Sequence, residues 1–213
     1  MGNHFANANG RIIVEELIRT IHENREYLSD IDGKIGDGDH GINMDKGFQL
    51  TASRLEDDMG MSDALKLLGR TLLLEIGGSM GPLYGQYFKA MAKVSQNHEE
   101  IGTEVFADML DAAYEAIRNL GEAKPGDKTL VDTLDPAAAA MRSAVDEGLE
   151  LPAALDRMVT AAETGWKSTE DMVAKIGRSS RLGERSRGVL DAGATSCCLM
   201  LKSMAKTMTE LAD

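Results

Sequence analysis

The sequence predicts an all-α protein that forms a single domain, residues 1–213, of eight helices lying antiparallel to their neighbours. Apolar residues recur at the three- and four-residue spacing of amphipathic helices along almost the whole chain. No segment alternates convincingly between apolar and polar residues, as a half-buried strand would. Most connections between the periodic segments are short, which favours antiparallel packing of consecutive helices.

The helices are predicted, in chain order, over residues 12–28, 42–57, 62–76, 81–94, 103–120, 129–147, 151–175 and 194–211. Ser62 and Thr103 are expected to cap the third and fifth helices, because their hydroxyls can accept from free N–H groups. Pro82 suits the first turn of the fourth helix, and Gly121 is a typical stop for the fifth. Pro136 predicts a kink or a late start in the sixth.

The charge balance limits the classes of partner. The chain has 23 basic and 35 acidic residues, a net charge of −12, which argues against non-specific binding to nucleic acid or to anionic membranes. A small anionic ligand would need a local basic patch or a bound metal. Cys197 and Cys198 are adjacent in an apolar run, so we expect reduced core thiols in a reducing compartment. Without a visible secretory signal or membrane span, a cytoplasmic, soluble protein is expected.

The stretch "DIDGKIGDGDHGINM", residues 30–44, concentrates aspartates and glycines. Asp32, Asp37 and Asp39 are separated by glycines that let the backbone fold back, so that their carboxylates can converge. All-oxygen ligands favour magnesium, manganese or calcium over zinc or copper. The alternative is an exposed Asp/Gly turn cluster, which is common. His40 adjoins the aspartates, and Asn43 follows it, although a lone histidine more often caps or packs.

Three further segments lie between predicted helices. "GGSMGPLYG", residues 77–85, presents glycines and Ser79 before a helix, either as an anion site or as a tight turn. "KPGDKTLVD", residues 124–132, offers Asp127, Lys128 and Thr129 at a helix start, where an aspartate usually acts as a cap. Gly193, Thr195 and Ser196 follow Asp191 at the start of the last helix.

The connection over residues 177–196 is about twenty residues long and has few apolar side chains. Long connections of this kind in a compact helical protein are usually functional or disordered. This one carries four arginines in an otherwise acidic chain: Arg178, Arg181, Arg185 and Arg187.

Taken together, four segments resemble, in order and spacing, the signature segments of the dihydroxyacetone kinase L subunit family. They are "IGDGDHGINMDKGF", "GGSMGPLYG", "PGDKTLVDTLDPA" and "GRSSRLGERSRGVLDAGATS". The resemblance covers essentially the whole chain. It implies a barrel of eight antiparallel helices with a nucleotide bound at one end, in agreement with the helix count above.

The resemblance also implies which residues carry the function. Asp32, Asp37 and Asp39 would hold two magnesium ions that bridge to the phosphates of ADP or ATP. Transfer would involve no covalent side-chain chemistry and would be supported by these aspartates and Arg178. The implied nucleotide contacts are His40, Gly41, Ile42, Asn43, Ser79, Met80, Gly121, Leu130, Arg178, Asp191, Ala192 and Gly193. Met80 stands where the family more often has a small polar residue.

The chain length resembles that of the free-standing L subunits of phosphoenolpyruvate-dependent dihydroxyacetone kinases. There, a phosphohistidine carrier subunit phosphorylates bound ADP, and the phosphoryl group passes to substrate on a separate K subunit. These subunits are the implied partners, and a homodimer is the implied assembly. Two alternatives are a nucleotide-loaded regulatory or interaction module and an L subunit that serves another keto-sugar, such as a tetrulose.

Overall fold

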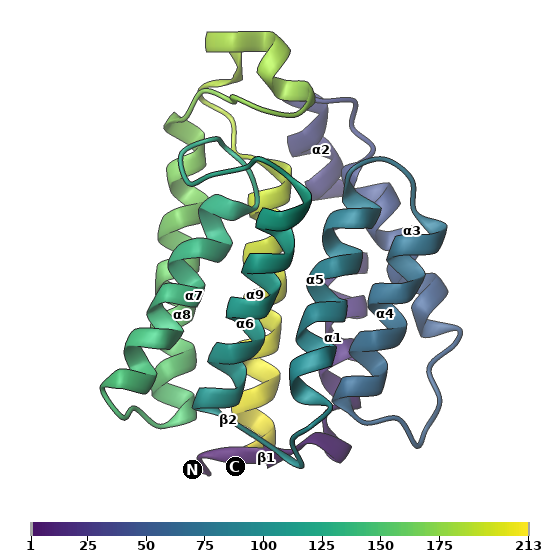
Figure 1. The fold of residues 1–213 in the computed structure, drawn as a ribbon. Coiled ribbons are helices and arrows are strands. Elements are labelled where there is room, and N and C mark those ends of the chain that lie inside the picture. The colour runs from purple at the N-terminus through teal and green to yellow at the C-terminus, as the bar shows by residue number, and fades with distance from the viewer. Residues whose placement is uncertain (1, 213) are drawn as a thin grey trace.

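The computed structural model describes residues 2–212, within which nine α-helices and a small two-stranded sheet are present (Figure 1). The α-helices are α1 (Arg11–Glu23), α2 (Arg25–Ile35), α3 (His40–Ala52), α4 (Met61–Glu75), α5 (Met80–Ser95), α6 (Thr103–Leu120), α7 (Val131–Asp146), α8 (Leu151–Ser168) and α9 (Ala192–Leu211). The 3₁₀ segments are η1 (Asn7–Asn9), η2 (Thr169–Asp171) and η3 (Arg178–Ser186). Strands β1 (His4–Ala6) and β2 (Glu100–Gly102) pair antiparallel. The all-α fold class is confirmed.

The first predicted helix, residues 12–28, is in fact two helices. The chain leaves helical geometry at Asn24, whose φ of −102° and ψ of 8° end α1. The side-chain amide of Asn24 donates to the carbonyl oxygen of Thr20 at 2.8 Å and so satisfies the last turn of α1. The sequence therefore predicted one helix fewer than the structure contains in residues 2–212, because apolar spacing continues across the break.

The core is built from the apolar faces of the long helices. Consecutive helices α4, α5, α6, α7 and α8 each pack on the next, and α9 packs against both α1 and α8. Tyr84, Tyr87 and Phe88 of α5 are buried, with the rings of Tyr87 and Phe88 edge to face at 4.9 Å between centroids. Phe48 of α3 packs edge to face on Phe88. The two cysteines are buried and unpaired.

Two predicted caps are wrong. Helix α4 begins after Gly60, and the Ser62 hydroxyl bonds instead to Asn7 and Ser95. Helix α6 spans the predicted residues, but Thr103 lies inside it and donates to the carbonyl oxygen of Leu149 at 3.2 Å. In both cases a distant partner outcompetes the local cap.

The region from α7 to α9 also differs in detail from the prediction. Pro136 lies inside α7, close to Gly165 of α8, where an added Cβ would come within 2.8 Å of the proline ring. Helix α8 ends at Ser168 rather than near residue 175. The predicted structureless connection over residues 177–196 contains η3 and the first turn of α9.

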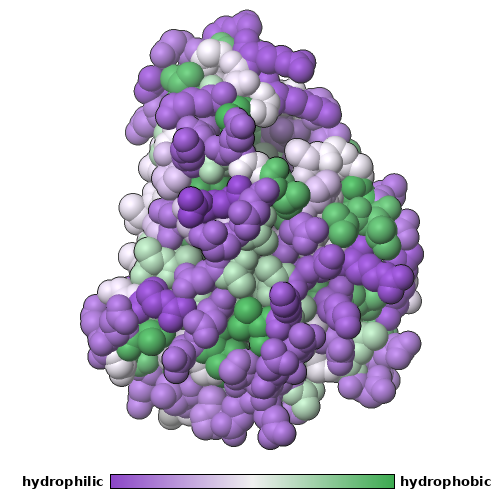
Figure 2. All heavy atoms as spheres, in the orientation of Figure 1, coloured by the Kyte–Doolittle hydropathy of each residue, from purple (hydrophilic) through white to green (hydrophobic). Residues whose placement is uncertain are grey.

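The two ends of the helical bundle differ. One end carries β1 and β2 together with the chain termini, whereas η3, the α2–α3 turn and the loop before α7 gather at the other (Figure 1). The segment that contains η3 projects beyond the helices and is covered mainly by hydrophilic side chains (Figure 2). Within residues 2–212, every helix is too short or too polar to cross a membrane.

Candidate functional site

Three carboxylates converge where α2 meets α3. Asp32 lies in the last turn of α2, and Asp37 and Asp39 lie in the turn that follows. The sequence placed all three between predicted helices, so for Asp32 that expectation is wrong. One oxygen from each lies within 4.8 Å of the others. Gly38 has a φ of +77°, which glycine adopts at little cost, and this lets the chain double back. We call Asp32, Asp37 and Asp39 the carboxylate cluster.

The carboxylate cluster has the chemistry of a magnesium site. Carboxylates at this separation repel one another, and a divalent cation with oxygen ligands relieves that repulsion. All three residues line a pocket, so a bound ion could complete its shell with ligands from outside the chain. The guanidinium of Arg178 forms an ion pair with Asp37 and already supplies one positive charge.

His40 begins α3 and faces the start of α9. Its Nε2 atom lies 2.9 Å from the Ser196 hydroxyl oxygen, which in turn lies 2.6 Å from the hydroxyl of Tyr84. Burial lowers the pKa of His40 to about 4, with the charge of Asp32 opposing the shift. The imidazole is therefore neutral near pH 7 and acts here as a hydrogen-bonding group.

The turn before α5 leaves backbone N–H groups at the pocket. Gly77, Gly78 and Ser79 are exposed and lead into the N-terminus of α5, where the helix dipole favours an anion. Gly81 sits so close to the turn that an added Cβ would be 2.0 Å from the Ile76 carbonyl oxygen. A side chain there would push α5 away from α4.

A second helix N-terminus faces the same pocket from α9. The Asp191 carboxylate caps this helix by accepting from the backbone N–H of Ala194 at 2.8 Å. Burial raises the pKa of Asp191 to about 7, partly offset by the hydrogen bond from Ala194. Ala192 and Gly193 follow at the pocket wall.

The loop before α7 is held by an aspartate that the sequence did not single out. The Asp132 carboxylate accepts from the backbone N–H groups of Gly126, at 2.5 Å, and Thr129, at 2.7 Å. Asp127, the expected cap, accepts instead from the N–H of Lys124 at 2.9 Å. Lys128, between these anchors, has a φ of 65° and is only 1% exposed.

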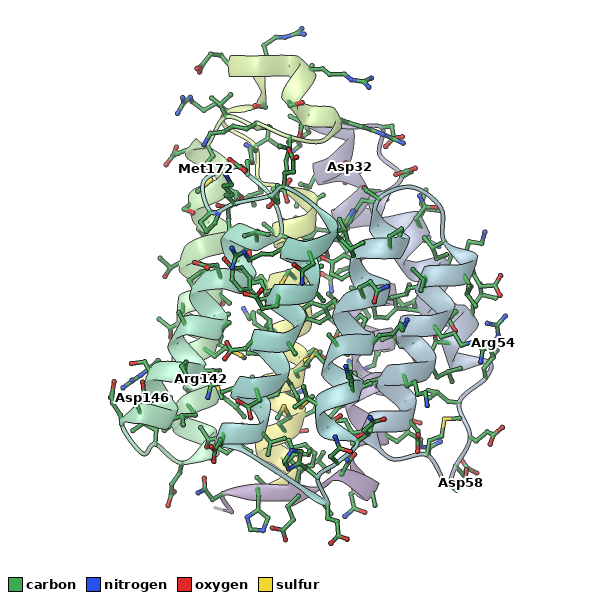
Figure 3. All side chains as sticks on the ribbon, in the orientation of Figure 1. Asp32, Arg54, Asp58, Arg142, Asp146 and Met172 are labelled. Atoms are coloured by element: carbon green, nitrogen blue, oxygen red, sulfur yellow. The ribbon has the colours of Figure 1, made fainter. Side chains whose placement is uncertain are left out.

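Residues 172–189, which we call the lid, cross above the pocket and contain η3. Arg178 reaches from the lid to Asp37, and Gly177, Ser179 and Arg181 also line the pocket. Met172, at the root of the lid, and Asp32 lie at the same end of the molecule, far from Arg54 and Asp58 (Figure 3). The lid therefore brings positive charge to the acidic end of α2.

These elements enclose one pocket of about 830 Å³. Its walls include most of the predicted site residues: Asp32, Asp37, Asp39, His40, Asn43, Ser79, Met80, Leu130, Arg178, Asp191, Ala192 and Gly193. Of the other predicted contacts, Gly41 packs against the Arg25 carbonyl, Ile42 is 58% exposed, and Gly121 ends α6. These three are not among the residues lining the pocket, and all of the predicted ligand contacts, inside the pocket or outside it, stay predictions.

The pocket also contains residues that the sequence did not assign to it. Tyr84 and Leu83 of α5, together with Lys128 and Thr129, lie in its wall. Tyr84 is only 1% exposed and packs in the core, but its hydroxyl reaches Ser196 and the Gly193 carbonyl. The only sequence signal for Lys128 and Thr129 was their position at a predicted helix start, in the segment of residues 124–132.

Comparison with known proteins places the chain in a family. The DAK2 domain matches residues 34–206. The chain is 38% identical over 189 residues to the ADP-binding subunit DhaL of the PEP-dependent dihydroxyacetone kinase of Escherichia coli, covering 87% of this chain and 89% of that protein. The chain belongs to the dihydroxyacetone kinase L subunit family. The resemblance noted in the sequence is confirmed.

Longer proteins contain a similar unit. The L-erythrulose kinase of Pectobacterium atrosepticum is 34% identical to this L-subunit family member over 185 residues, which are 85% of this chain and 31% of that kinase. The crystal structure of the dihydroxyacetone kinase from C. freundii in complex with AMP-PNP and Mg²⁺ aligns with a TM-score of 0.68 and 25% identity. That alignment covers 95% of this chain and 34% of the longer kinase.

Proposed function

We propose that this chain is the nucleotide-binding subunit of a dihydroxyacetone kinase. The observation that carries the proposal is the meeting of the carboxylate cluster, two helix N-termini and Arg178 around one pocket. Such a site suits polyphosphate with a divalent cation: carboxylates hold the metal, and N–H groups and a guanidinium hold phosphate oxygens. The similarity to an ADP-binding subunit supports the same assignment.

The carboxylate cluster would hold magnesium, and two ions are part of the proposal. Bound there, magnesium would neutralise the charge of phosphate oxygens. Asp32 comes from a helix end, whereas Asp37 and Asp39 come from the following turn, so a bound ion would join the two segments. A C. freundii kinase of similar fold was crystallised with Mg²⁺ and a nucleotide analogue, which supports this reading.

The remaining residues would position the nucleotide. The N-termini of α5 and α9 would bind phosphate oxygens through backbone N–H groups, and His40 would act as a neutral hydrogen-bonding group. Arg178 would stabilise the negative charge on the phosphoryl group during transfer. Phosphoryl transfer needs orientation and charge neutralisation more than covalent participation by the protein, and these groups provide both.

The phosphoryl group would arrive from a phosphohistidine carrier subunit and leave to dihydroxyacetone held on a separate K subunit. The name of the Escherichia coli relative, a subunit of a PEP-dependent kinase, supports this division of labour. We further propose that residues 1–213 act as one unit, as a homodimer, with the helices in the barrel that the family resemblance implies.

Another keto-sugar is the second candidate acceptor. The similarity to the L-erythrulose kinase favours a tetrulose. Because substrate choice would reside in the K subunit, both acceptors are compatible with the same pocket. Reconstituted with a K subunit and a phosphorylated carrier, the chain can be offered dihydroxyacetone and erythrulose in competition, and the ratio of phosphorylated products decides between them.

The decisive experiment is native mass spectrometry of the purified protein, followed by calorimetry. We expect added mass equal to ADP and two magnesium ions, and loss of the nucleotide after EDTA treatment. Failure to bind ADP or ATP with magnesium in calorimetry would contradict the proposal. Nucleotide binding without phosphorylated product in the reconstituted assay would favour a regulatory module.

A further inference from the structure

Lys128 is a buried lysine whose ammonium group faces the lid. It donates to the carbonyl oxygens of Met172 at 3.1 Å, Ser186 at 2.6 Å and Val189 at 2.5 Å. A lysine has three N–H donors, so all of them are used by lid carbonyls. Lys128 lines the pocket, yet none of its donors is left for a phosphate in this arrangement.

The three acceptors come from both ends of the lid. Met172 starts the lid and precedes η3, whereas Ser186 is the last residue of η3 and Val189 ends the lid. The two ends are also tied to each other, because the N–H of Ala174 donates to the Ser186 hydroxyl at 2.9 Å. Both ends of the lid are therefore held by one ammonium group, and Arg178 lies in the segment between them.

The backbone at Lys128 is shaped for this contact. Its φ of 65° lies in the left-handed region, which is uncommon for a residue with a side chain. The Asp132 carboxylate holds the N–H groups of Gly126 and Thr129 on either side and so supports that conformation. A lysine that merely filled space in the core would not need this local strain.

We propose that Lys128 is a positioning residue that fixes the lid, and with it Arg178, over the carboxylate cluster. Lifting the lid would break three hydrogen bonds from a charged group at once, and hydrogen bonds to charged groups are stronger than those between neutral groups. Burial lowers the pKa of Lys128, consistent with an enclosed ammonium group. The inference rests on the proposed function for the role of Arg178, but not for what holds the lid in place.

Trypsin treatment of the full-length native protein tests whether Lys128 holds the lid in place, because the lid contains cleavable arginines. In Lys128→Met, cleavage after Arg181 should be about tenfold faster than in the wild type, since three hydrogen bonds to a charged group are lost. Lys175→Met is the matched control. Lys175 is also in the lid, but its exposed side chain makes only an ion pair with Asp127 at 3.3 Å, so cleavage should stay within about twofold.

A double-mutant cycle tests the action through Arg178. Magnesium-ADP affinity, measured by calorimetry, should fall about tenfold in Lys128→Met. In Lys128→Met/Arg178→Ala it should be no lower than in Arg178→Ala alone, because the lid no longer presents the guanidinium in either variant. Additive losses would overturn the positioning role, and so would an unchanged rate of cleavage in Lys128→Met.

Circular dichroism and thermal unfolding will establish that the variants fold. If Lys128→Met does not, Lys128→Gln, whose amide keeps part of the donor capacity, is put through the same two measurements. The trypsin result needs no nucleotide. If the protein binds no ADP, the proposed function fails, and the cleavage rates alone still confirm or overturn the proposal that Lys128 fixes the lid.

Discussion

The Nε2 atom of His40 lies 2.9 Å from the hydroxyl oxygen of Ser196. This hydrogen bond joins the N-terminal turns of α3 and α9 beside the carboxylate cluster. The hydroxyl of Tyr84 completes the junction from α5. Three helices from distant parts of the chain are thereby held at one wall of the pocket. Because the pKa of His40 is lowered to about 4, the junction is uncharged near neutral pH.

Ser196→Ala should loosen this junction. The change removes a partner of both His40 and Tyr84, and we expect magnesium-ADP affinity to fall roughly three- to tenfold, the value of one or two neutral hydrogen bonds. Calorimetry measures it. Ser53→Ala is the control, because Ser53 lies just beyond the opposite end of α3 and its hydroxyl donates only to the Leu50 carbonyl oxygen. Equal affinities in wild type and Ser196→Ala would show that the junction does not position the ligand.

Asp37→Ala should remove magnesium-dependent nucleotide binding without unfolding the protein. Asp37 is exposed in the α2–α3 turn, so its loss costs no core packing, and removing one of three neighbouring carboxylates reduces repulsion. We expect nucleotide affinity to fall at least about tenfold, since even outer-shell partners of metal ligands matter this much.

The matched control for this change is Asp58→Ala. Asp58 is an exposed aspartate at the other end of the molecule (Figure 3). Calorimetry with ADP and titrated magnesium compares the two variants, while thermal unfolding reports their stability. A normal magnesium dependence in Asp37→Ala would remove Asp37 from the metal site.

Arg178→Ala should slow phosphoryl transfer more than it weakens nucleotide binding. A guanidinium that neutralises developing charge acts mainly in the transition state, so we expect the turnover of the reconstituted kinase to fall roughly 100-fold. Arg178→Lys should recover only part of the rate, because an ammonium group cannot make two parallel hydrogen bonds. Arg157→Ala, which breaks a surface pair with Glu147 beside Asp146, at the end of the molecule away from the pocket (Figure 3), should leave turnover unchanged.

The sequence predicted the carboxylate cluster better than it predicted the contacts that hold the pocket together. Asp32, Asp37 and Asp39 were recognisable because glycines separate them, and their convergence follows from local chain geometry. The contacts that hold the site together have no local pattern. Lys128 bonds to carbonyl oxygens, which every residue possesses, and Ser196 meets His40 across 156 positions of the chain. Neither partner can be inferred from residue type or spacing.

The fold shows the same division. Helix α6 was predicted with its bounds, since a long apolar stripe and a terminal glycine define it. The break at Asn24 was missed because apolar spacing continues through it, and the short strands β1 and β2 were missed because three residues are too few to show alternation. The cap expected at Ser62 failed because Asn7, distant in sequence, bonds to its hydroxyl.

Gly81→Ala should destabilise the protein, whereas Gly77→Ala should not. A Cβ at Gly81 would lie 2.0 Å from the Ile76 carbonyl oxygen, a backbone atom that cannot rotate away. At Gly77 an added Cβ meets nothing within 4 Å, and its φ is not in the left-handed region. We expect Gly81→Ala to lower the free energy of unfolding by about 1–3 kcal/mol and Gly77→Ala by less than about 0.5 kcal/mol. Urea unfolding gives both values. Equal stability of the two variants would contradict the close approach of α5 to the preceding turn.

Asp191 should make a contribution to the stability of the ligand-free protein that falls as pH rises from about 4 to about 7, opposite in sign to the contribution of His40, whose pKa is lowered to about 4. Burial raises the pKa of Asp191 from 3.8 to about 7 in the folded protein, so between these values the folded state holds a proton that the unfolded chain has released. This proton favours folding at the acid end of the window, and the advantage disappears as pH passes the folded-state pKa. Its upper bound is on the order of 4 kcal/mol.

Asp191→Asn isolates that contribution. Asparagine caps a helix as well as aspartate, so the bond to the Ala194 N–H is kept while the titration is removed. In urea unfolding with EDTA and without nucleotide, the difference in stability between Asp191→Asn and wild type should grow in favour of the variant as pH rises from 4 to 7. A constant difference across this range would mean that Asp191 titrates at its ordinary pKa, and that the carboxylate is solvated within the pocket.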